Sequence, residues 1–171
     1  WAKTNPPPNI SCRYFTYSTE FIIWARKSQK KPHFFNYELM KQLNGDKQMT
    51  DVWRLPAIAQ WEKSCGKHPT QKPLALLARI ILASTPKNAW ILDPFAGSST
   101  TGIAANLISR RYLGIEKEKS FVEIAKQRKL EIENFNKFAE IQSKIKDIAI
   151  SEFSVQTNIV CENIVENDLP F

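Results

Sequence analysis

The sequence predicts an α/β protein built around a parallel sheet. Between residues 68 and 136, segments with helical periodicity alternate with short apolar segments that are typical of buried strands. The chain has 171 residues, of which 43% are hydrophobic and 24% are charged, so it can bury a core and has the composition of a globular protein. These observations exclude a disordered or collagen-like chain.

The first part of the chain predicts fewer regular elements. A proline-rich turn at residues 5–9 is followed by an apolar run at residues 21–25, which predicts a buried strand. Residues 30–67 are basic and polar, with aromatic residues between them. They predict a loop-rich insertion rather than a part of the sheet.

Helices and strands then alternate in a regular order. The first helix is predicted from one apolar face, which carries Leu74, Leu77, Ala78, Ile81 and Leu82. Residues 90–92 and 112–115 predict short strands, and residues 101–109 predict the helix that joins them. Because the connection is helical, the two strands are expected to run parallel.

A long helix is predicted after the second strand. Ser120 and Glu123 have the spacing of a capping box, which predicts where this helix begins. Its apolar stripe is expected in the core and comprises Phe121, Ala125, Ile132, Phe135 and Ala139. From about Asn136 the pattern weakens and the charge turns acidic, which predicts a helix tail and a loosely held C-terminus.

The charge of the chain favours a polyanionic partner. There are 24 Lys and Arg residues against 17 Asp and Glu, a net charge of +7. Residues 151–171 contain four acids and no Lys or Arg, so residues 1–150 carry a net charge of +11. Such a basic body suits nucleic acid, although a solvated basic surface explains the charge equally well.

Cysteine and apolar patterns predict a cytoplasmic protein without a metal site or a membrane span. The three cysteines form no C-x-x-C pair, and their spacing from the two histidines fits no zinc pattern. The apolar stretch at residues 74–83 is interrupted by Arg79 and is too short to cross a bilayer. The N-terminus has no signal-peptide pattern.

The segment DPFAGSSTTG, residues 93–102, is the strongest chemical signal. It lies where a strand ends and a helix begins, which is where ligands bind in doubly wound sheets. Glu116 follows the next strand, 23 residues beyond Asp93, at the position where an acid holds the ribose hydroxyls of a nucleotide. The loop and the spaced acid together predict a nucleotide-like cofactor.

This segment and the hexapeptide HPTQKP at residues 68–73 resemble the paired cofactor motifs of the beta-group DNA amino-methyltransferases. The resemblance covers roughly residues 1–135. It includes the segments 1–6, 12–16, 18–20, 36–37, 45–49 and 51–53. Within the group, the chain is most similar to adenine methylases of type II restriction systems that read GATC. The resemblance implies a Rossmann-like S-adenosylmethionine-dependent methyltransferase sheet with a loop-rich target-recognition insertion.

The resemblance assigns the cofactor S-adenosylmethionine to named residues. Thr100 would meet its carboxylate and Glu116 its ribose hydroxyls, while Thr70 and Lys72 would close over the methionine moiety. The residues lining the methionine and ribose end would be Asp93, Phe95, Gly97, Ser98 and Ser99. The group usually has Gly where this chain has Ser99, which is tolerated only if the backbone dihedral there is ordinary.

The catalytic motif of the group, an Asp or Asn followed by Pro-Pro and an aromatic residue, is not found in this chain. Residues 5–8, NPPP, are rejected as a substitute because the last residue is not aromatic and the setting matches a later segment of the group. We therefore expect the N-terminal catalytic part to be missing and its motif to lie upstream of Trp1. No residue of this chain is assigned a catalytic role.

Three functions remain open at this stage. The leading one is adenine-N6 methylation of a short DNA site, with GATC as the candidate; cytosine-N4 methylation and a non-catalytic remnant that binds DNA or cofactor are the alternatives. Candidate DNA contacts are Arg13, Lys47, Gln48 and Arg54. A homodimer and an association with the missing N-terminal part are both compatible with the sequence.

The resemblance also divides the chain into four regions. Residues 1–29 would belong to the catalytic sheet region, and residues 30–67 would form the target-recognition insertion. Residues 68–136 would form the cofactor-binding half, and residues 137–171 the helix tail and acidic C-terminus.

Overall fold

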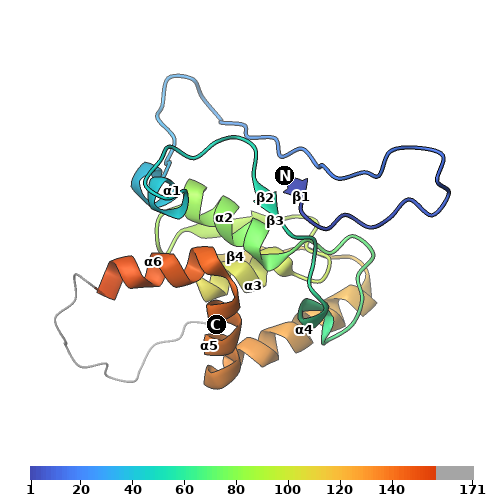
Figure 1. The fold of residues 1–171 in the computed structure, drawn as a ribbon. Helices are drawn as coiled ribbons and strands as arrows, with labels where there is room; N and C mark the ends of the chain where they lie inside the picture. The colour runs from blue at the N-terminus through green and yellow to red at the C-terminus, as the bar shows by residue number, and fades with distance from the viewer. Residues whose placement is uncertain (157–171) are drawn as a thin grey trace.

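The computed structural model describes residues 1–156 and contains two small parallel sheets among six α-helices (Figure 1). The larger sheet pairs β3 (Trp90–Asp93) with β4 (Arg111–Gly114), so that Asp93 lies opposite Gly114. Helix α3 (Thr100–Leu107) connects the two strands. The predicted strand–helix–strand unit is therefore confirmed, with each boundary within two residues of the expected one.

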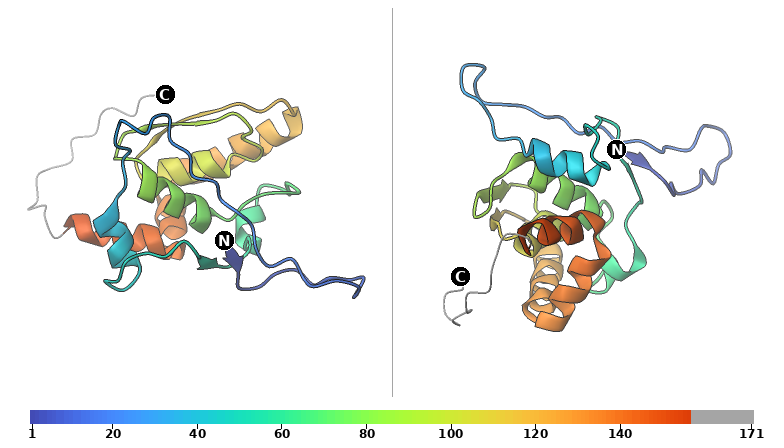
Figure 2. Two further views of the ribbon diagram at one scale, coloured as in Figure 1. Left: turned by 90° about the horizontal axis from the view of Figure 1, so that it is seen from above. Right: turned by 60° about the vertical axis from the view of Figure 1, so that its left-hand side comes forward.

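Helices cover one face of this sheet. Helix α2 (Leu74–Ser84) packs against α3, and Figure 2 (left) shows both on the same side of the strands. Ile91 and Tyr112 point toward this side and pack against the core, whereas Trp90 and Leu92 are 66% and 62% exposed. Parallel sheets are normally covered on both faces. Within residues 1–156, no strand beyond β3 and β4 joins this sheet.

The core lies among the helices and extends further along the chain than the sequence predicted. Helices α5 (Phe135–Lys144) and α6 (Lys146–Gln156) contribute Ile141 and Ile148 to it, and Ile145 between the two helices is also buried there. An ion pair between Arg79 and Asp147, with Nε and Oδ2 2.6 Å apart, joins α2 to α6. The stretch predicted to be a helix tail after Asn136 therefore forms two packed helices; the acidic stretch beyond residue 156 lies outside the described residues.

The long C-terminal helix is broken in a way that local patterns did not predict. Helix α4 (Lys119–Glu133) begins after Glu118, so Ser120 is inside the helix and the predicted capping box is wrong. Asn134 ends α4 and caps α5, because its side chain accepts a hydrogen bond from the Lys137 amide. The chain turns there, which leaves Phe135 81% exposed. The expected core position of Phe135 and of Ala139 is also wrong.

The predicted strand at residues 21–25 is not formed. Phe21 and Ile23 are 97% and 90% exposed, and this segment pairs with no strand in the part of the chain that the structure describes. Backbone pairing occurs just before it, in a bridge between Ala2 and Thr19. An apolar run becomes a buried strand only when a neighbouring strand satisfies its amides and carbonyls, and none of the described strands lies beside this one.

The insertion contains short elements. Helix α1 (Tyr37–Leu43) packs against α2 and places Met40 in the core. Strand β1 (Ala2–Lys3) pairs in parallel with β2 (Arg54–Leu55), and the 3₁₀ helix η1 (Gln60–Lys63) follows. Among the described residues, no helix has the length and hydropathy needed to cross a bilayer.

Candidate cofactor-binding site

The loop between β3 and α3, residues 94–99, is named the cofactor loop below. Asp93 opens it by accepting a hydrogen bond from the Phe95 amide at 3.0 Å. Two of its residues have left-handed backbone, Gly97 with φ +52° and Ser99 with φ +58°. Gly adopts this conformation without strain, but a side chain makes it costly. The dihedral at Ser99 is therefore not ordinary, which makes the departure from the usual Gly a strained one.

Gly97 also allows the hexapeptide, residues 68–73, to approach the cofactor loop. A Cβ atom at Gly97 would lie 2.9 Å from Nε2 of His68, closer than real Cβ atoms come to a neighbour. The His68 ring is held from the other side by Phe121 of α4, with ring centroids 4.1 Å apart. The two motifs singled out in the sequence are thus in direct contact, and the glycine is required by that contact.

Glu116 closes the loop from the end of β4. Its carboxylate accepts hydrogen bonds from the amides of Glu118, Gly97 and Lys117, each at 2.8 Å. These backbone hydrogen bonds lower the pKa of Glu116 below its usual value, and the bond from the Glu118 amide has the largest effect. The carboxyl group is therefore ionised at neutral pH. The Asp93–Glu116 pair therefore lies at neighbouring strand ends, as the sequence predicted.

Arg128 holds the inner side of the cofactor loop. This residue of α4 is only 5% exposed, and one of its terminal nitrogens donates to the Ser98 carbonyl at 2.8 Å and the Thr100 hydroxyl at 2.9 Å. The Ser98 hydroxyl lies 3.2 Å from the same nitrogen. Burial lowers the pKa of Arg128, while the nearby Glu62 carboxylate opposes that shift. The two hydroxyls therefore face α4 within the protein.

Glu62 gives the hexapeptide its support. This buried carboxylate accepts the Leu74 amide at 2.7 Å, at the first turn of α2, and the Ala59 amide at 3.1 Å. Its backbone carbonyl accepts a hydrogen bond from the Gln71 side chain. Burial raises the pKa of Glu62, and the two backbone hydrogen bonds partly offset this. The insertion is thereby attached to the segment that carries the hexapeptide.

The sequence of this chain matches a known protein family. The profile of the DNA methylase family N6_N4_Mtase matches residues 1–127. The chain belongs to this family. It is 67% identical over 132 residues to the type II methyltransferase M2.MboI of Moraxella bovis, covering 77% of this chain and 48% of that protein. It is 59% identical over 135 residues to M2.DpnII of Streptococcus pneumoniae, covering 78% and 50% respectively.

A solved structure agrees with this assignment. The complex of M1.HpyAVI with SAM is 38% identical and superposes with a TM-score of 0.59, covering 75% of this chain and 58% of that one. The predicted α/β methyltransferase fold is therefore confirmed. The chain spans about half the length of the curated relatives it matches.

Two further residues assigned to the cofactor lie on the outer side of this methylase fold. Thr70 is exposed, and its amide donates to Nδ1 of His68 at 3.3 Å. Lys72 pairs with Glu20 at 2.7 Å, and Lys3 pairs with the other oxygen of the same carboxylate at 2.8 Å. Partial burial alone would raise the pKa of Glu20, but hydrogen bonds from the two lysines lower it. Phe95 projects into solvent from the cofactor loop.

The four residues predicted to contact DNA are all exposed and come from three separate segments. Arg13 lies in the N-terminal loop, Lys47 and Gln48 follow α1, and Arg54 is in β2. The structure records no ion pair for the three cations among them, Arg13, Lys47 and Arg54, within the described residues. In the same part of the chain, no group of three His, Cys, Asp or Glu residues is placed to hold a metal ion.

Arg128 and Glu62 are the residues that sequence reasoning missed. A usable signal existed for Arg128, because it is spaced four residues from Ile124 and from Ile132 and so shares the apolar face of its helix. A charged residue on a buried face needs a buried partner. No comparable pattern marks Glu62, whose role follows from the tertiary contact between η1 and α2.

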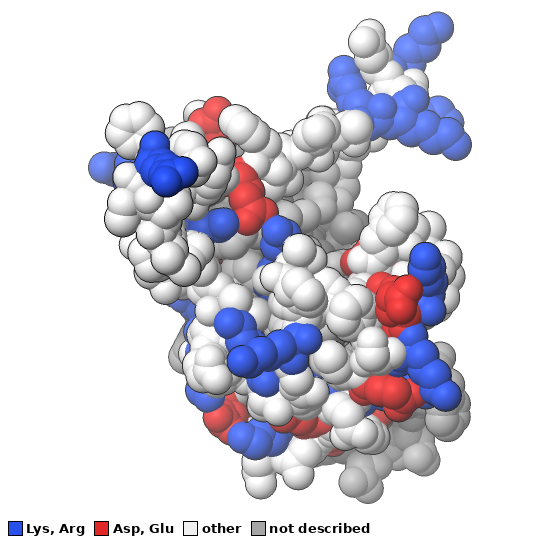
Figure 3. Space-filling view, turned by 90° about the vertical axis from the view of Figure 1, so that its right-hand side faces the viewer, with Lys and Arg blue, Asp and Glu red and all other residues white. Residues whose placement is uncertain are grey.

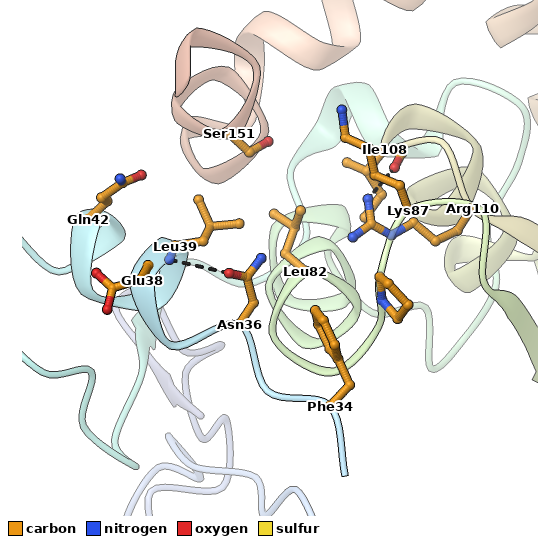
Figure 4. A pocket seen from close by; sticks show the side chains of 11 residues that line it. Phe34, Asn36, Glu38, Leu39, Gln42, Leu82, Lys87, Ile108, Arg110 and Ser151 are labelled. Carbon is orange, nitrogen blue, oxygen red and sulfur yellow. Dashed lines mark hydrogen bonds between the residues drawn. The ribbon is translucent and has the colours of Figure 1, made fainter. Parts of the chain in front are cut away.

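A cavity of about 400 Å³ lies away from the cofactor loop, between α1, α2 and the start of β4 (Figure 4). Phe34 and Leu82 line it, and Arg110 and Lys87 lie at one end. Arg110 donates to the carbonyls of Thr85 and Ile108, so its guanidinium is held by the protein itself. None of the residues assigned to the cofactor lines this cavity.

Proposed function

We propose that this chain is the cofactor-binding part of an S-adenosylmethionine-dependent DNA adenine-N6 methyltransferase from a type II restriction-modification system. The observation that carries the proposal is the direct contact between the hexapeptide and the cofactor loop, at His68 and Gly97, beside the Glu116 carboxylate. The family assignment supports the reaction class, and the M1.HpyAVI structure is a complex with SAM. The described residues offer no metal site, and this reaction requires none.

The cofactor would lie against the outer face of the cofactor loop. Glu116 is ionised and would accept hydrogen bonds from the ribose hydroxyls. The exposed Phe95 ring would cover the ligand from one side. Lys72 and Thr70 would close over the methionine carboxylate. Lys72 is paired with Glu20 in the present structure, so it would exchange one carboxylate partner for another.

Ser98 and Thr100 contribute differently from Glu116. Their hydroxyls are buried and bound by Arg128, so we assign them to shaping the cofactor loop. Contact with the cofactor would come from the backbone of the loop and from the start of α3, whose amides favour an anionic group. Ser99 would lie at the turn between the cofactor loop and α3.

Methyl transfer from a sulfonium is a direct displacement, in which positioning and preparation of the amine nucleophile dominate. The residues of this chain would orient the methyl donor and contact DNA through Arg13, Lys47, Gln48 and Arg54. Acceptance of the amine hydrogens, and stacking of a flipped base, would require the acid-Pro-Pro-aromatic motif that this sequence lacks. Adenine within GATC is the proposed target; cytosine-N4 transfer and a non-catalytic remnant are the alternatives.

The uncovered face of β3 and β4 supports association with a complementary segment. Trp90, Leu92 and Leu113 are exposed there, which is unusual for strands of a parallel sheet. We propose that the segment bearing the catalytic motif covers this face and completes the sheet, in a cytoplasmic enzyme. A homodimer formed through the same face is the competing arrangement, and analytical ultracentrifugation of the chain with and without that segment distinguishes them.

The cofactor proposal is tested by calorimetric titration with S-adenosylmethionine. Glu116→Ala should weaken binding by about 1–3 kcal/mol, the usual cost of removing a charged hydrogen-bond acceptor and leaving its donors without a partner. Glu118→Ala is the matched control, because it removes a nearby exposed carboxylate. The backbone amide of residue 118, which donates a hydrogen bond to Glu116, is kept. Equal affinities of wild type and Glu116→Ala would remove Glu116 from the site, and absence of binding by the wild type would overturn the proposal.

The activity proposal is tested with labelled S-adenosylmethionine and duplex DNA containing GATC. Residues 1–171 alone should transfer no label, and addition of a family segment carrying the acid-Pro-Pro-aromatic motif should restore transfer to adenine. Label on cytosine would favour the N4 alternative. Transfer by residues 1–171 alone would show that the catalytic motif was misplaced, with residues 5–8 as the first candidates.

A further inference from the structure

Residues 25–33 form a projecting loop before α1, named the basic loop below. Four of its side chains are cations, Arg26, Lys27, Lys30 and Lys31, and all four are exposed. No acidic residue lies between Glu20 and Glu38. The loop is the highest point of the ribbon in Figure 1, and in Figure 3 a group of basic side chains stands clear of the body at the same height.

Contacts at its base hold the basic loop in shape. The Trp24 ring lies edge-on to His33, with centroids 5.0 Å apart, and also contacts Phe35 at 5.4 Å. Near the tip, the Lys30 amide donates to the Ser28 hydroxyl at 3.2 Å. An aromatic cluster therefore brings the two ends of the loop together, and a local turn presents the cations between them.

The cations of the basic loop have no acidic partner among residues 1–156. None of the four forms an ion pair in the described part of the chain. By contrast, Lys126 and Lys129 on α4 pair with acids one turn away on the same helix. Four like charges within six residues repel one another, so their concentration at an exposed tip is unfavourable without an anionic partner.

We propose that the basic loop is a clamp for the phosphate backbone of duplex DNA. This inference rests on the proposed function, and it adds a contact that the residues already assigned to DNA do not include. Lys and Arg presented without a fixed acceptor suit phosphate, which is sequence-independent, better than base edges, which need oriented partners. Figure 3 shows a hollow between the projecting group and the body, so DNA held by the loop would lie against the protein surface.

The test is the salt dependence of DNA binding by the chain with Lys27→Gln and Lys30→Gln combined. The slope of log affinity against log salt concentration should become shallower by about 1.8, because each phosphate contact contributes about 0.9. At 0.1 M salt the affinity should fall on the order of tenfold or more. The loss should be equal for a duplex containing GATC and for a scrambled duplex.

The matched control combines Lys126→Gln with Lys129→Gln. It removes the same net charge from exposed positions on α4, and it should leave the slope unchanged. An unchanged slope in the basic-loop variant, a loss equal to that of the control, or a loss confined to the GATC duplex would each overturn the proposal. Salt-sensitive binding to vesicles of anionic lipid, without binding to either duplex, would assign the loop to a membrane instead.

This experiment separates the clamp from the function on which it rests. If the wild type binds neither duplex, the proposed function and the clamp both fall. If the wild type binds and the basic-loop variant binds equally well, only the clamp falls.

Discussion

Arg128→Met should destabilise the protein through the cofactor loop. The guanidinium is buried beneath that loop and donates to the Ser98 carbonyl and to two hydroxyls. Its positive charge also lowers the pKa of the buried Glu62 carboxylate, which supports the hexapeptide, and does so more than the charge of Lys63 does. Methionine fills a similar volume but supplies neither the donors nor the charge.

The magnitude follows from the groups left without a partner. A hydrogen bond that involves a charged group contributes about 1.5–3 kcal/mol, but the three contacts share one nitrogen and are not additive. Removing one member of a buried charged network costs about 3–5 kcal/mol. We therefore expect Arg128→Met to lower the free energy of unfolding by about 3–5 kcal/mol, a large part of the 5–15 kcal/mol typical of a domain.

Urea unfolding followed by tryptophan fluorescence measures this loss, and two variants calibrate it. Arg128→Lys keeps the charge near Glu62 and one donor, so it should lose about 1–2 kcal/mol. Lys129→Met, at the next position, replaces an exposed side chain and should stay within about 0.5 kcal/mol of wild type.

The reasoning also predicts a binding effect beyond stability. Arg128→Lys, if folded, should bind S-adenosylmethionine more weakly, because the loop backbone is less firmly held. A free energy of unfolding for Arg128→Met that lies within about 1 kcal/mol of the wild-type value would refute the assigned role. Unchanged cofactor affinity in Arg128→Lys would confine the residue to stability.

Three other predictions concern the loop and the C-terminal helices. Ser99→Gly should stabilise the fold by about 1 kcal/mol by relieving the left-handed backbone, whereas Ser98→Gly should destabilise it; thermal unfolding of the pair decides this. The pKa of Glu116 is lowered in the folded state from its ordinary value of 4.5, so its contribution is complete above about pH 4.5 and is lost as the pH falls further. The stability gap between wild type and Glu116→Gln should therefore be constant above pH 5 and should close in acid; a gap that widens in acid would contradict the assignment. Asp147→Asn should cost about 3 kcal/mol in urea unfolding, because it leaves Arg79 half-paired between α2 and α6, and a neutral result would show that α6 is not part of the cooperative unit.

The sequence by itself determined the strand–helix–strand unit and the two motifs that flank it. Strands β3 and β4 and helices α2 and α3 were predictable because their apolar patterns are local, although one face of the two strands is exposed in the structure. The loop after β3 and the acid after β4 were predictable because the carboxyl ends of neighbouring parallel strands meet at one edge.

Tertiary structure alone decided the features that depend on distant partners. Residues 21–25 have the composition of a buried strand, but no strand within residues 1–156 lies beside them, so the hydrophobic side chains remain exposed. Asn134 could have stayed in a continuous helix, and its capping bond to the α5 backbone turns the chain instead. That turn brings Ile141 and Ile148 into the core.

The same distinction applies within the candidate site. Gly97, Ser99 and Glu116 could be singled out from their order in the chain, but the left-handed backbone at Ser99 appears only in three dimensions. Arg128 lies 30 residues from Ser98 in the sequence, and only the packing of α4 brings it to the cofactor loop. Glu62 lies 12 residues before Leu74, and only the placement of η1 brings its carboxylate to the start of α2. Local pattern reports the preferences of a segment, whereas a buried charge is explained by the partner that the fold places beside it.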